Sequence, residues 1–386
     1  MVIGKKMIFL FIAAFAVQAT MGQTRTRSGL DPERFDSVMD GKKTGLYTLV
    51  NRLGVEACVT NYGGRLVSLV YRYRDMVLGF DNVGDYRRYR QNFGATVGRY
   101  TGRIFGARFS LDGQTYQLQG SGGNISHGGY PGFADRVWDV IGQTDSALAL
   151  RYMSPDGENG FPGTMTVDLT YRLRCRIVAS AGRRMIEVPA LEVNYEVKTD
   201  KPTVVNLTNH SFFNISGHHN EPITSETLYV NSDEIAVFDS KKNLDGTFMN
   251  VEGTPFDFRR PRMIGQRIDD DHAQLKVTGG YDHSFMIRTN GTQEKLAARV
   301  FDPASGTCLT VYTTEPAVHI YTSNGLKGNL KGKDGIKYPR RSAICLETMH
   351  LADAPNHPNF PSTVVRPGEV YRSQTTFVWS DFVMDK

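Results

Sequence analysis

A histidine stands among alternating polar residues in one apolar stretch of the chain, which reads TVVNLTNHSFFNISG. On a β-strand alternate side chains share one face, so His210 would point the same way as Asn206 and Thr208. Val205 and Leu207 would then point into the opposite layer. Polar groups on one face of an apolar strand either meet solvent or line a site. In a site, the imidazole of His210 could act as a general acid or base near neutral pH.

A glutamate occurs in a second β-rich stretch, which reads SAICLETM. Alternation would place Glu347 on one face with Ala343 and Cys345, and Ile344 and Leu346 on the other. Burial among small apolar neighbours raises the pKa of a carboxyl group and makes it a better base near neutrality. The alternative is a glutamate at a strand end that reaches solvent.

Three other stretches carry residues that could bind a polar ligand. In NFGATVGRYTGRIFGAR, alternation would put Arg99, Thr101 and Arg103 on one face, where a guanidinium can bind sugar hydroxyls or a carboxylate. His127 precedes two glycines, which allow the backbone to approach a ligand closely. Asp282 stands at the start of an apolar strand. A surface ion pair, a solvated loop histidine and a turn-closing aspartate are the alternatives for these residues.

Short strands must position these residues, because β-rich segments bounded by Gly, Asn, Asp or Pro dominate beyond residue 30. Helical patterns of ten residues or more are nearly absent, and Gly84–Gln91 is expected to form one short helix. Strands without intervening helices predict an all-β fold, a large antiparallel β-sandwich over about residues 30–386 in a single domain. The expected strands are Val55–Thr60, Arg65–Tyr71, Ala147–Met153, Met165–Leu173, Leu191–Val197, Ala298–Phe301, Cys308–Thr313 and Ala343–Thr348.

The composition agrees with a folded protein rich in turns and aromatic residues. The chain has 386 residues, of which 40% are hydrophobic and 22% charged, so a large core can form and general disorder is excluded. A net charge of +5, with scattered basic residues, gives no electrostatic basis for binding nucleic acid. No GxSxG motif, phosphate loop or closely spaced cysteine pair is present. The four cysteines are expected to be small core residues, although an oxidising compartment would allow disulfides.

The N-terminus has the order of a secretory signal. Lys5 and Lys6 precede the apolar run 7–17, and small residues follow. The run is about half as long as a membrane-spanning helix requires, so we expect residues 1–22 to be a signal peptide rather than a membrane anchor or a buried helix. Cleavage after Ala19 or Gly22 would leave a periplasmic or secreted protein without a membrane anchor.

Taken together, nine ordered blocks resemble the aldose 1-epimerase family, also called galactose mutarotases. The most telling blocks are NLTNHSFFN and DAPNHPNFPS. The others include NYGGRLVSL, VLGFDNVGDY, NFGATVGRYTGRI, SHGGYPGF, GENGFPG, GGYDHSF and VYTTEPAVHIYTSN. The resemblance runs from Asn61 to Trp379 and implies the same large antiparallel β-sandwich.

The resemblance also implies roles for the residues described above. It makes Glu347 the general base and His210 the general acid, and it makes Arg103, His127 and Asp282 sugar-binding residues. The implied reaction interconverts the α and β anomers of free aldohexoses such as glucose and galactose by opening and reclosing the ring. Because no redox change or phosphate transfer occurs, no cofactor and no metal are expected. The expected partner is a small-molecule monosaccharide, with no nucleic acid, and the expected assembly is a monomer or a weak homodimer.

Three positions depart from the family pattern. Gly102 stands where the family commonly has asparagine, His319 stands where it often has glutamine, and the usual GFDK reads GFAD. These changes leave the implied acid–base pair, Glu347 and His210, in place, but they put the identity of the preferred sugar in question. The alternatives are a non-catalytic carbohydrate-binding protein on the same fold, a glycosidase that uses Asp282 with Glu347, and a sugar-phosphate epimerase that uses Arg99 and Arg103.

Overall fold

A computed structural model describes residues 25–179, 185–288 and 294–381, and these segments are built almost entirely from antiparallel strands. Within them, the α-helices are only α1 (Val83–Tyr89) and α2 (Ala273–Thr278). No helix in the described segments is both long enough and apolar enough to cross a membrane. The expected all-β fold is therefore confirmed, while the expected signal peptide lies outside the described residues.

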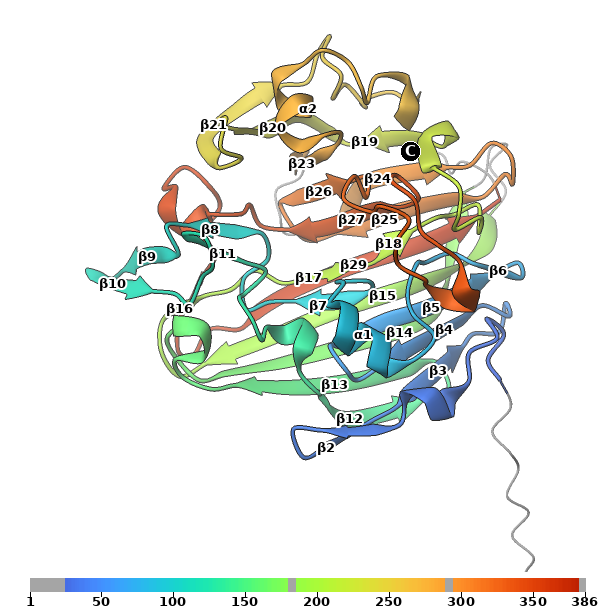
Figure 1. Cartoon of the computed structure of the whole chain (residues 1–386), viewed down its shortest axis with the longest axis horizontal. Helices are drawn as coiled ribbons and strands as arrows, with labels where there is room; N and C mark the ends of the chain where they lie inside the picture. The colour runs from blue at the N-terminus through green and yellow to red at the C-terminus, as the bar shows by residue number, and fades with distance from the viewer. Residues whose placement is uncertain (1–24, 180–184, 289–293, 382–386) are drawn as a thin grey trace, which may run out of the picture.

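One layer is a sheet of nine strands in the order β12-β13-β14-β15-β29-β25-β24-β19-β22. Figure 1 shows its long strands lying side by side across the molecule. The bounds are β12 (Asp139–Thr144), β13 (Ala147–Ser154), β14 (Met165–Ala179), β15 (Met185–Thr199), β29 (Tyr371–Ser380), β25 (Cys308–Thr313), β24 (Lys295–Phe301), β19 (Thr227–Val230) and β22 (Arg262–Met263).

The second layer is a sheet of six strands in the order β18-β27-β26-β23-β20-β21. The bounds are β18 (Phe212–Phe213), β27 (Ile344–Met349), β26 (Ala317–Tyr321), β23 (Asp282–Ile287), β20 (Ser232–Phe238) and β21 (Leu244–Asn250). A four-stranded sheet continues the fold with β3 (Leu46–Val50), β4 (Glu56–Thr60), β5 (Arg65–Tyr71) and β6 (Arg74–Asp75).

Short two-stranded sheets complete the fold, and two of them carry residues of the site. The chain around His210 forms β17 (Thr208–His210), which pairs with β7 (Ala95–Val97). β8 (Arg103–Phe105) pairs with β11 (Asn124–Ser126). The remaining pairs are β1 (Ser37–Met39) with β2 (Lys42–Thr44), β9 (Arg108–Leu111) with β10 (Gln114–Gln117), and β16 (Thr203–Val204) with β28 (Val364–Val365).

The main core lies between the nine-stranded and six-stranded sheets. Alternate residues of β14 such as Leu169 and Tyr171 enter it from one side, and Ile344 and Leu346 of β27 enter it from the other. Burying each such side chain contributes about 1.5–3 kcal/mol. The period of two that fills this core also sends Glu347 to the opposite face of β27, as the sequence predicts.

The strands expected from the sequence are all present, and two of them, β5 and β25, have the expected bounds. The expected helix is α1, which begins one residue earlier because the side chain of Asn82 accepts a hydrogen bond from the backbone N–H of Asp85. It ends at Tyr89, and the next residue, Arg90, has the left-handed conformation. Helix α2 is too short to leave a periodic signal in the sequence.

The cysteines are free thiols in the described segments. Cys58, Cys308 and Cys345 are buried, and Cys175 is half-buried. Their expected place in the interior is thus confirmed for three of the four.

Candidate active site

Glu347 belongs to a row of polar side chains that crosses three neighbouring strands. In the register of β26 and β27, Glu347 lies directly opposite His319, and in the register of β23 and β26, His319 lies opposite Ser284. These strands are interior members of the six-stranded sheet, so hydrogen bonds on both sides fix the backbone beneath the row. The row lies on the face of the sheet that is turned away from the main core.

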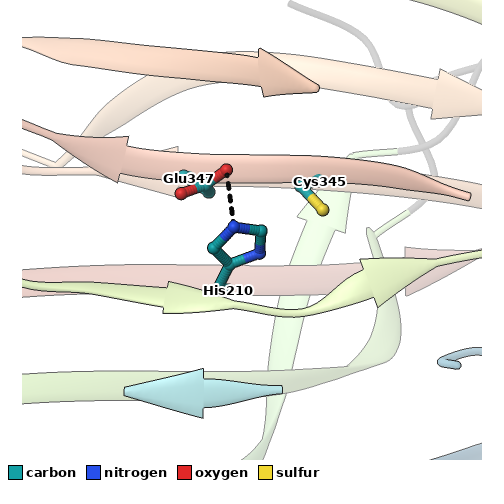
Figure 2. A group of neighbouring side chains, drawn as sticks. All are labelled: His210, Cys345 and Glu347. Atoms are coloured by element: carbon teal, nitrogen blue, oxygen red, sulfur yellow. Dashed lines mark ion pairs between the residues drawn. The ribbon is translucent and has the colours of Figure 1, made fainter. Parts of the chain in front are cut away.

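His210 is brought to this row by β17. The backbone carbonyl of His210 accepts a hydrogen bond from the N–H of Gly94, and its imidazole stacks on Phe212 with ring centroids 5.1 Å apart. Its Nε2 lies 3.5 Å from Oε1 of Glu347. Figure 2 marks this contact with a dashed line. His210 is 6% exposed and Glu347 is 3% exposed. One small molecule in the adjacent cavity can therefore touch both groups while bulk water is largely kept away.

The other polar residues of the TVVNLTNHS stretch turn to the same neighbouring segment, as alternation predicts. The amide of Asn206 donates to the carbonyl of His350 over 3.0 Å, and the hydroxyl of Thr208 donates to the carbonyl of Thr348 over 3.0 Å. These bonds fix β17 against the end of β27. Of the three polar residues, His210 alone lines the cavity.

A cavity of about 340 Å³ opens over the row, and all five residues proposed from the sequence line it. They are Glu347, His210, Arg103, His127 and Asp282. They come from three different sheets and from the loop after β11, so only the folded chain brings them together.

His127 is a neutral side chain that can donate a hydrogen bond into the cavity. It has a positive φ of 53°, which turns the chain tightly before Gly128. Burial, together with the nearby charge of Arg103, lowers the pKa of His127 to about 4. Its Nδ1 accepts a hydrogen bond from the N–H of Gly102 over 3.4 Å, so the ring proton is on Nε2. That N–H is free to donate to an oxygen of a ligand.

Asp282 is held between two cationic groups. Its Oδ1 lies 2.8 Å from Nε2 of His319, and its Oδ2 accepts from Nζ of Lys242 over 2.6 Å. Although burial raises the pKa of Asp282, the hydrogen bond from His319 and the charge of Lys242 outweigh it and hold that pKa well below its usual range. Burial lowers the pKa of His319, but the bond to Asp282 outweighs burial and raises it. Asp282 is therefore an ionised acceptor.

Lys242 and Arg90 are cavity residues that sequence reasoning missed. Lys242 lies in the connection between β20 and β21, within the polar stretch DSKKNLDG. Arg90 follows α1 in a stretch with two other arginines nearby. Nothing in either stretch distinguishes a cavity residue from a solvated one, because the contact with the site arises only in the tertiary structure.

Glu347 and His210 are both uncharged in the free protein below about pH 7. Burial raises the pKa of Glu347 to about 7. Burial and the neighbouring His127 lower the pKa of His210 well below its usual range. Below about pH 7 the pair therefore holds one proton, and in the free protein this proton resides on the carboxyl group.

Arg99 does not join Arg103 at the cavity, and that expectation is wrong. Its guanidinium is buried and donates to the carbonyls of Pro162 and Gly163, each over 2.9 Å, and to the hydroxyl of Ser154. Alternation fails here because β7 ends at Val97 and β8 begins at Arg103, so the residues between them are not on a strand. Arg99 is a structural residue that fastens the 154–163 loop.

Gly102 has a packing role at the cavity wall. Its φ is +78°, and a Cβ atom at this position would lie 2.7 Å from Cβ of Ala352. A larger side chain, such as that of asparagine, would therefore displace the 349–352 segment. Because residue 102 is a glycine, the neighbouring backbone at Ala352 can approach it closely.

His210, Cys345 and Glu347 form a group that could hold a metal ion, which we term the His–Cys–Glu cluster (Figure 2). One potential ligand atom from each lies within 4.8 Å of the others. Burial raises the pKa of the Cys345 thiol well above its usual value, so this thiol is protonated at neutral pH. The donor set suits a thiophilic cation such as Zn²⁺, which would have to displace that proton.

Comparison with known proteins identifies the family to which the chain is similar. The sequence model of the family described as aldose 1-epimerase matches residues 45–378. Human galactose mutarotase is 39% identical over 311 residues, which cover 80% of this chain and 85% of that protein. Aldose 1-epimerase of Escherichia coli K12 is 33% identical over 346 residues, which cover 88% of this chain and 96% of that protein. Galactose 1-epimerase from Lactobacillus acidophilus NCFM superposes with a TM-score of 0.76 at 25% identity, covering 90% of this chain and 97% of that chain.

Proposed function

Because the chain belongs to the aldose 1-epimerase family and therefore interconverts the α and β anomers of an aldose, we propose that Glu347 and His210 carry out the proton transfers. The observation that carries this proposal is the 3.5 Å separation of the two side chains beside a cavity of about 340 Å³. The proposed substrates are free aldohexoses such as glucose and galactose.

Ring opening requires one proton to leave the hydroxyl at C1 and another to reach the ring oxygen. In the reactive complex Glu347 is ionised and His210 is protonated, which a proton shift across the pair produces. Glu347 takes the proton from O1 while His210 donates to the ring oxygen, so the C1–O5 bond breaks and a C1=O1 bond forms. The products are an open aldehyde, a neutral carboxyl group and a neutral imidazole. Burial favours this neutral pair and therefore stabilises the site in the open-chain state.

Reclosure on the other face gives the second anomer. The aldehyde turns by about half a rotation around C1–C2 while the remaining hydroxyls are held. His210 then takes the proton from the attacking O5 hydroxyl, and Glu347 returns its proton to O1. We assign the holding contacts to Arg103, His127 and Asp282. Asp282 offers the lone pairs that His319 and Lys242 leave free, and His127 offers its Nε2–H.

The test is the anomer exchange of fresh α-galactose, followed by polarimetry and corrected for the spontaneous reaction. The variant Glu347→Gln keeps the shape of the side chain but removes the base, so we expect a loss of about 10²–10⁴-fold with sugar binding retained. His210→Asn should lose activity to a similar extent. Activity like that of the wild type in Glu347→Gln would remove this residue as the base.

The same measurements separate catalysis from sugar binding alone. A carbohydrate-binding protein on this fold would bind galactose in calorimetry but would leave the rate of optical change at its spontaneous value. An isomerase accelerates that rate in proportion to the protein concentration.

We further propose that the protein is exported to the periplasm or secreted, on the basis of the charged and apolar order of residues 1–22. N-terminal sequencing of the mature protein should find a start at residue 20 or 23. A chain that retains Met1 in the cytoplasm would contradict this proposal.

A further inference from the structure

Two guanidinium groups at the cavity have no acidic partner among the described residues. Arg90 and Arg103 both line the cavity, and neither side chain forms an ion pair within those residues. The carboxylates of the described cavity wall are already engaged: Asp282 contacts Lys242 and His319, and Glu347 contacts His210. The cavity therefore has a surplus of positive charge that a neutral sugar does not compensate.

Arg90 is held at the rim of the cavity by its surroundings. Its backbone has a φ of 49°, and its N–H donates to the carbonyl of Tyr86 at the end of α1. Its guanidinium lies 3.8 Å from the centroid of the Tyr130 ring, a cation–π contact that restrains the side chain. A cation whose position is restrained in advance loses less entropy when it binds an anion.

The segments that carry the two arginines both adjoin His210 or its neighbour His127. Residues 90–92 line the cavity and lead into Ala95, which is the register partner of His210 in the β7–β17 pair. Arg103 lies close enough to His127 to lower its pKa, and the rings of His127 and His210 are 5.6 Å apart. Both arginines therefore line the cavity on segments that lead to the proposed acid.

This placement corresponds to one end of a pyranose. In the proposed function, His210 protonates the ring oxygen, and the carbon next to that oxygen carries the exocyclic C6 group. C6 therefore lies near His210, in the cavity that both guanidinium groups line. A hydroxymethyl group there needs no cation, whereas a carboxylate or phosphate matches the planar fork of arginine.

Resting on the proposed function, we propose that the preferred substrate is an aldose with a negative charge on C6, such as a hexuronate, bound by Arg90 and Arg103. The reaction at C1 is unchanged, because the anion lies away from the hemiacetal and takes no part in proton transfer. The preference should weaken as salt screens the attraction at the partly exposed rim.

The experiment compares initial rates of anomer exchange for galactose, galacturonate and galactose 6-phosphate with the wild-type protein, each corrected for its spontaneous rate. We expect kcat/KM for at least one anionic sugar to exceed that for galactose by about tenfold or more at low salt, as for other steered charged ligands. Comparing galacturonate with galactose 6-phosphate shows whether the site prefers a carboxylate or a phosphate. Raising the salt concentration should lower the anionic rate and leave the galactose rate nearly constant.

Two variants show whether Arg90 carries the preference. Arg90→Gln should lower kcat/KM for the anionic sugar about tenfold and change that for galactose by less than about twofold. Arg88→Gln is the matched control, because Arg88 is an exposed arginine of α1 that does not line the cavity, and it should behave like the wild type.

The outcomes separate this inference from the proposed function. Exchange of galactose with no preference for either anionic sugar would overturn the inference and leave the function standing. An equal loss for galactose and the anionic sugar in Arg90→Gln would also overturn it. Absence of exchange with every sugar would overturn both.

Discussion

Replacing His319 by glutamine should move the alkaline limit of the reaction to higher pH. The active pair carries one proton, and the last proton leaves it from Glu347, whose pKa burial raises to about 7. Above that value the pair has no proton to donate, so kcat/KM falls as pH rises. With a pKa of about 7, the pair keeps its proton in about nine tenths of the molecules at about pH 6 and in about one tenth at about pH 8.

The charges that face Glu347 determine the direction of the shift. His319 of β26 lowers the pKa of Glu347, and Asp282 of β23 raises it. In His319→Gln the positive charge is lost while Asp282 keeps its negative charge and its contact with Lys242. Both consequences favour the protonated carboxyl group, so the limit rises. A shift of about one pKa unit corresponds to about 1.4 kcal/mol of lost charge stabilisation.

The assay is the pH profile of kcat/KM between about pH 5 and pH 9, with the spontaneous rate subtracted at each pH. The wild type should lose about tenfold between about pH 6 and pH 8, and His319→Gln should lose much less over that range. Ser284→Ala is the control, since it removes the partner of Nδ1 of His319 but keeps the imidazole charge. If kcat/KM of the wild type instead rises through pH 7 to a plateau, the reaction does not require the one proton that Glu347 and His210 share, and the reasoning is refuted. A limit that moves to lower pH in His319→Gln would refute the role of His319.

Three other predictions concern metal binding and packing. Zn²⁺ should inhibit anomer exchange by binding the His–Cys–Glu cluster, and Cys345→Ser should weaken this inhibition about tenfold or more. The test measures the rate against Zn²⁺ concentration, and equal inhibition of both proteins would contradict the prediction. Arg99→Met should lower the free energy of unfolding in urea by about 2–4 kcal/mol, because buried carbonyls lose their donors; an unchanged midpoint would argue against the buried network. Gly102→Asn should cost about 1–3 kcal/mol through contact with Ala352, and Ala352→Gly in the same chain should restore most of it in thermal unfolding; no rescue would show that the strain lies elsewhere.

The sequence predicted the strands well because each buries alternate side chains in one continuous core. Ile344 and Leu346 enter the core while Glu347 leaves it, and the same period places Val205 and Leu207 opposite His210. These residues are read correctly because a one-residue slip would expose every apolar side chain of the strand.

The same reasoning failed where the chain is not a strand. Alternation predicts that Arg99 shares a face with Arg103, but Arg99 lies in the connection between β7 and β8, where side chains do not alternate as they do on a strand. Lys242 and Arg90 could not be found for a related reason. Each stands in a polar connection whose contact with the cavity depends on how distant sheets meet, and that information is not local.

The register of the interior strands has a consequence for how new specificities could arise. Glu347, His319 and His210 stand on strands whose backbones are paired, whereas Arg90, His127 and Lys242 stand on the connections between strands. Connections tolerate insertion and replacement better than paired backbone does. Exchanging these connections between homologous enzymes should therefore redirect the choice of sugar while leaving the proton-transfer machinery in place, which makes this scaffold suited to engineering by loop grafting.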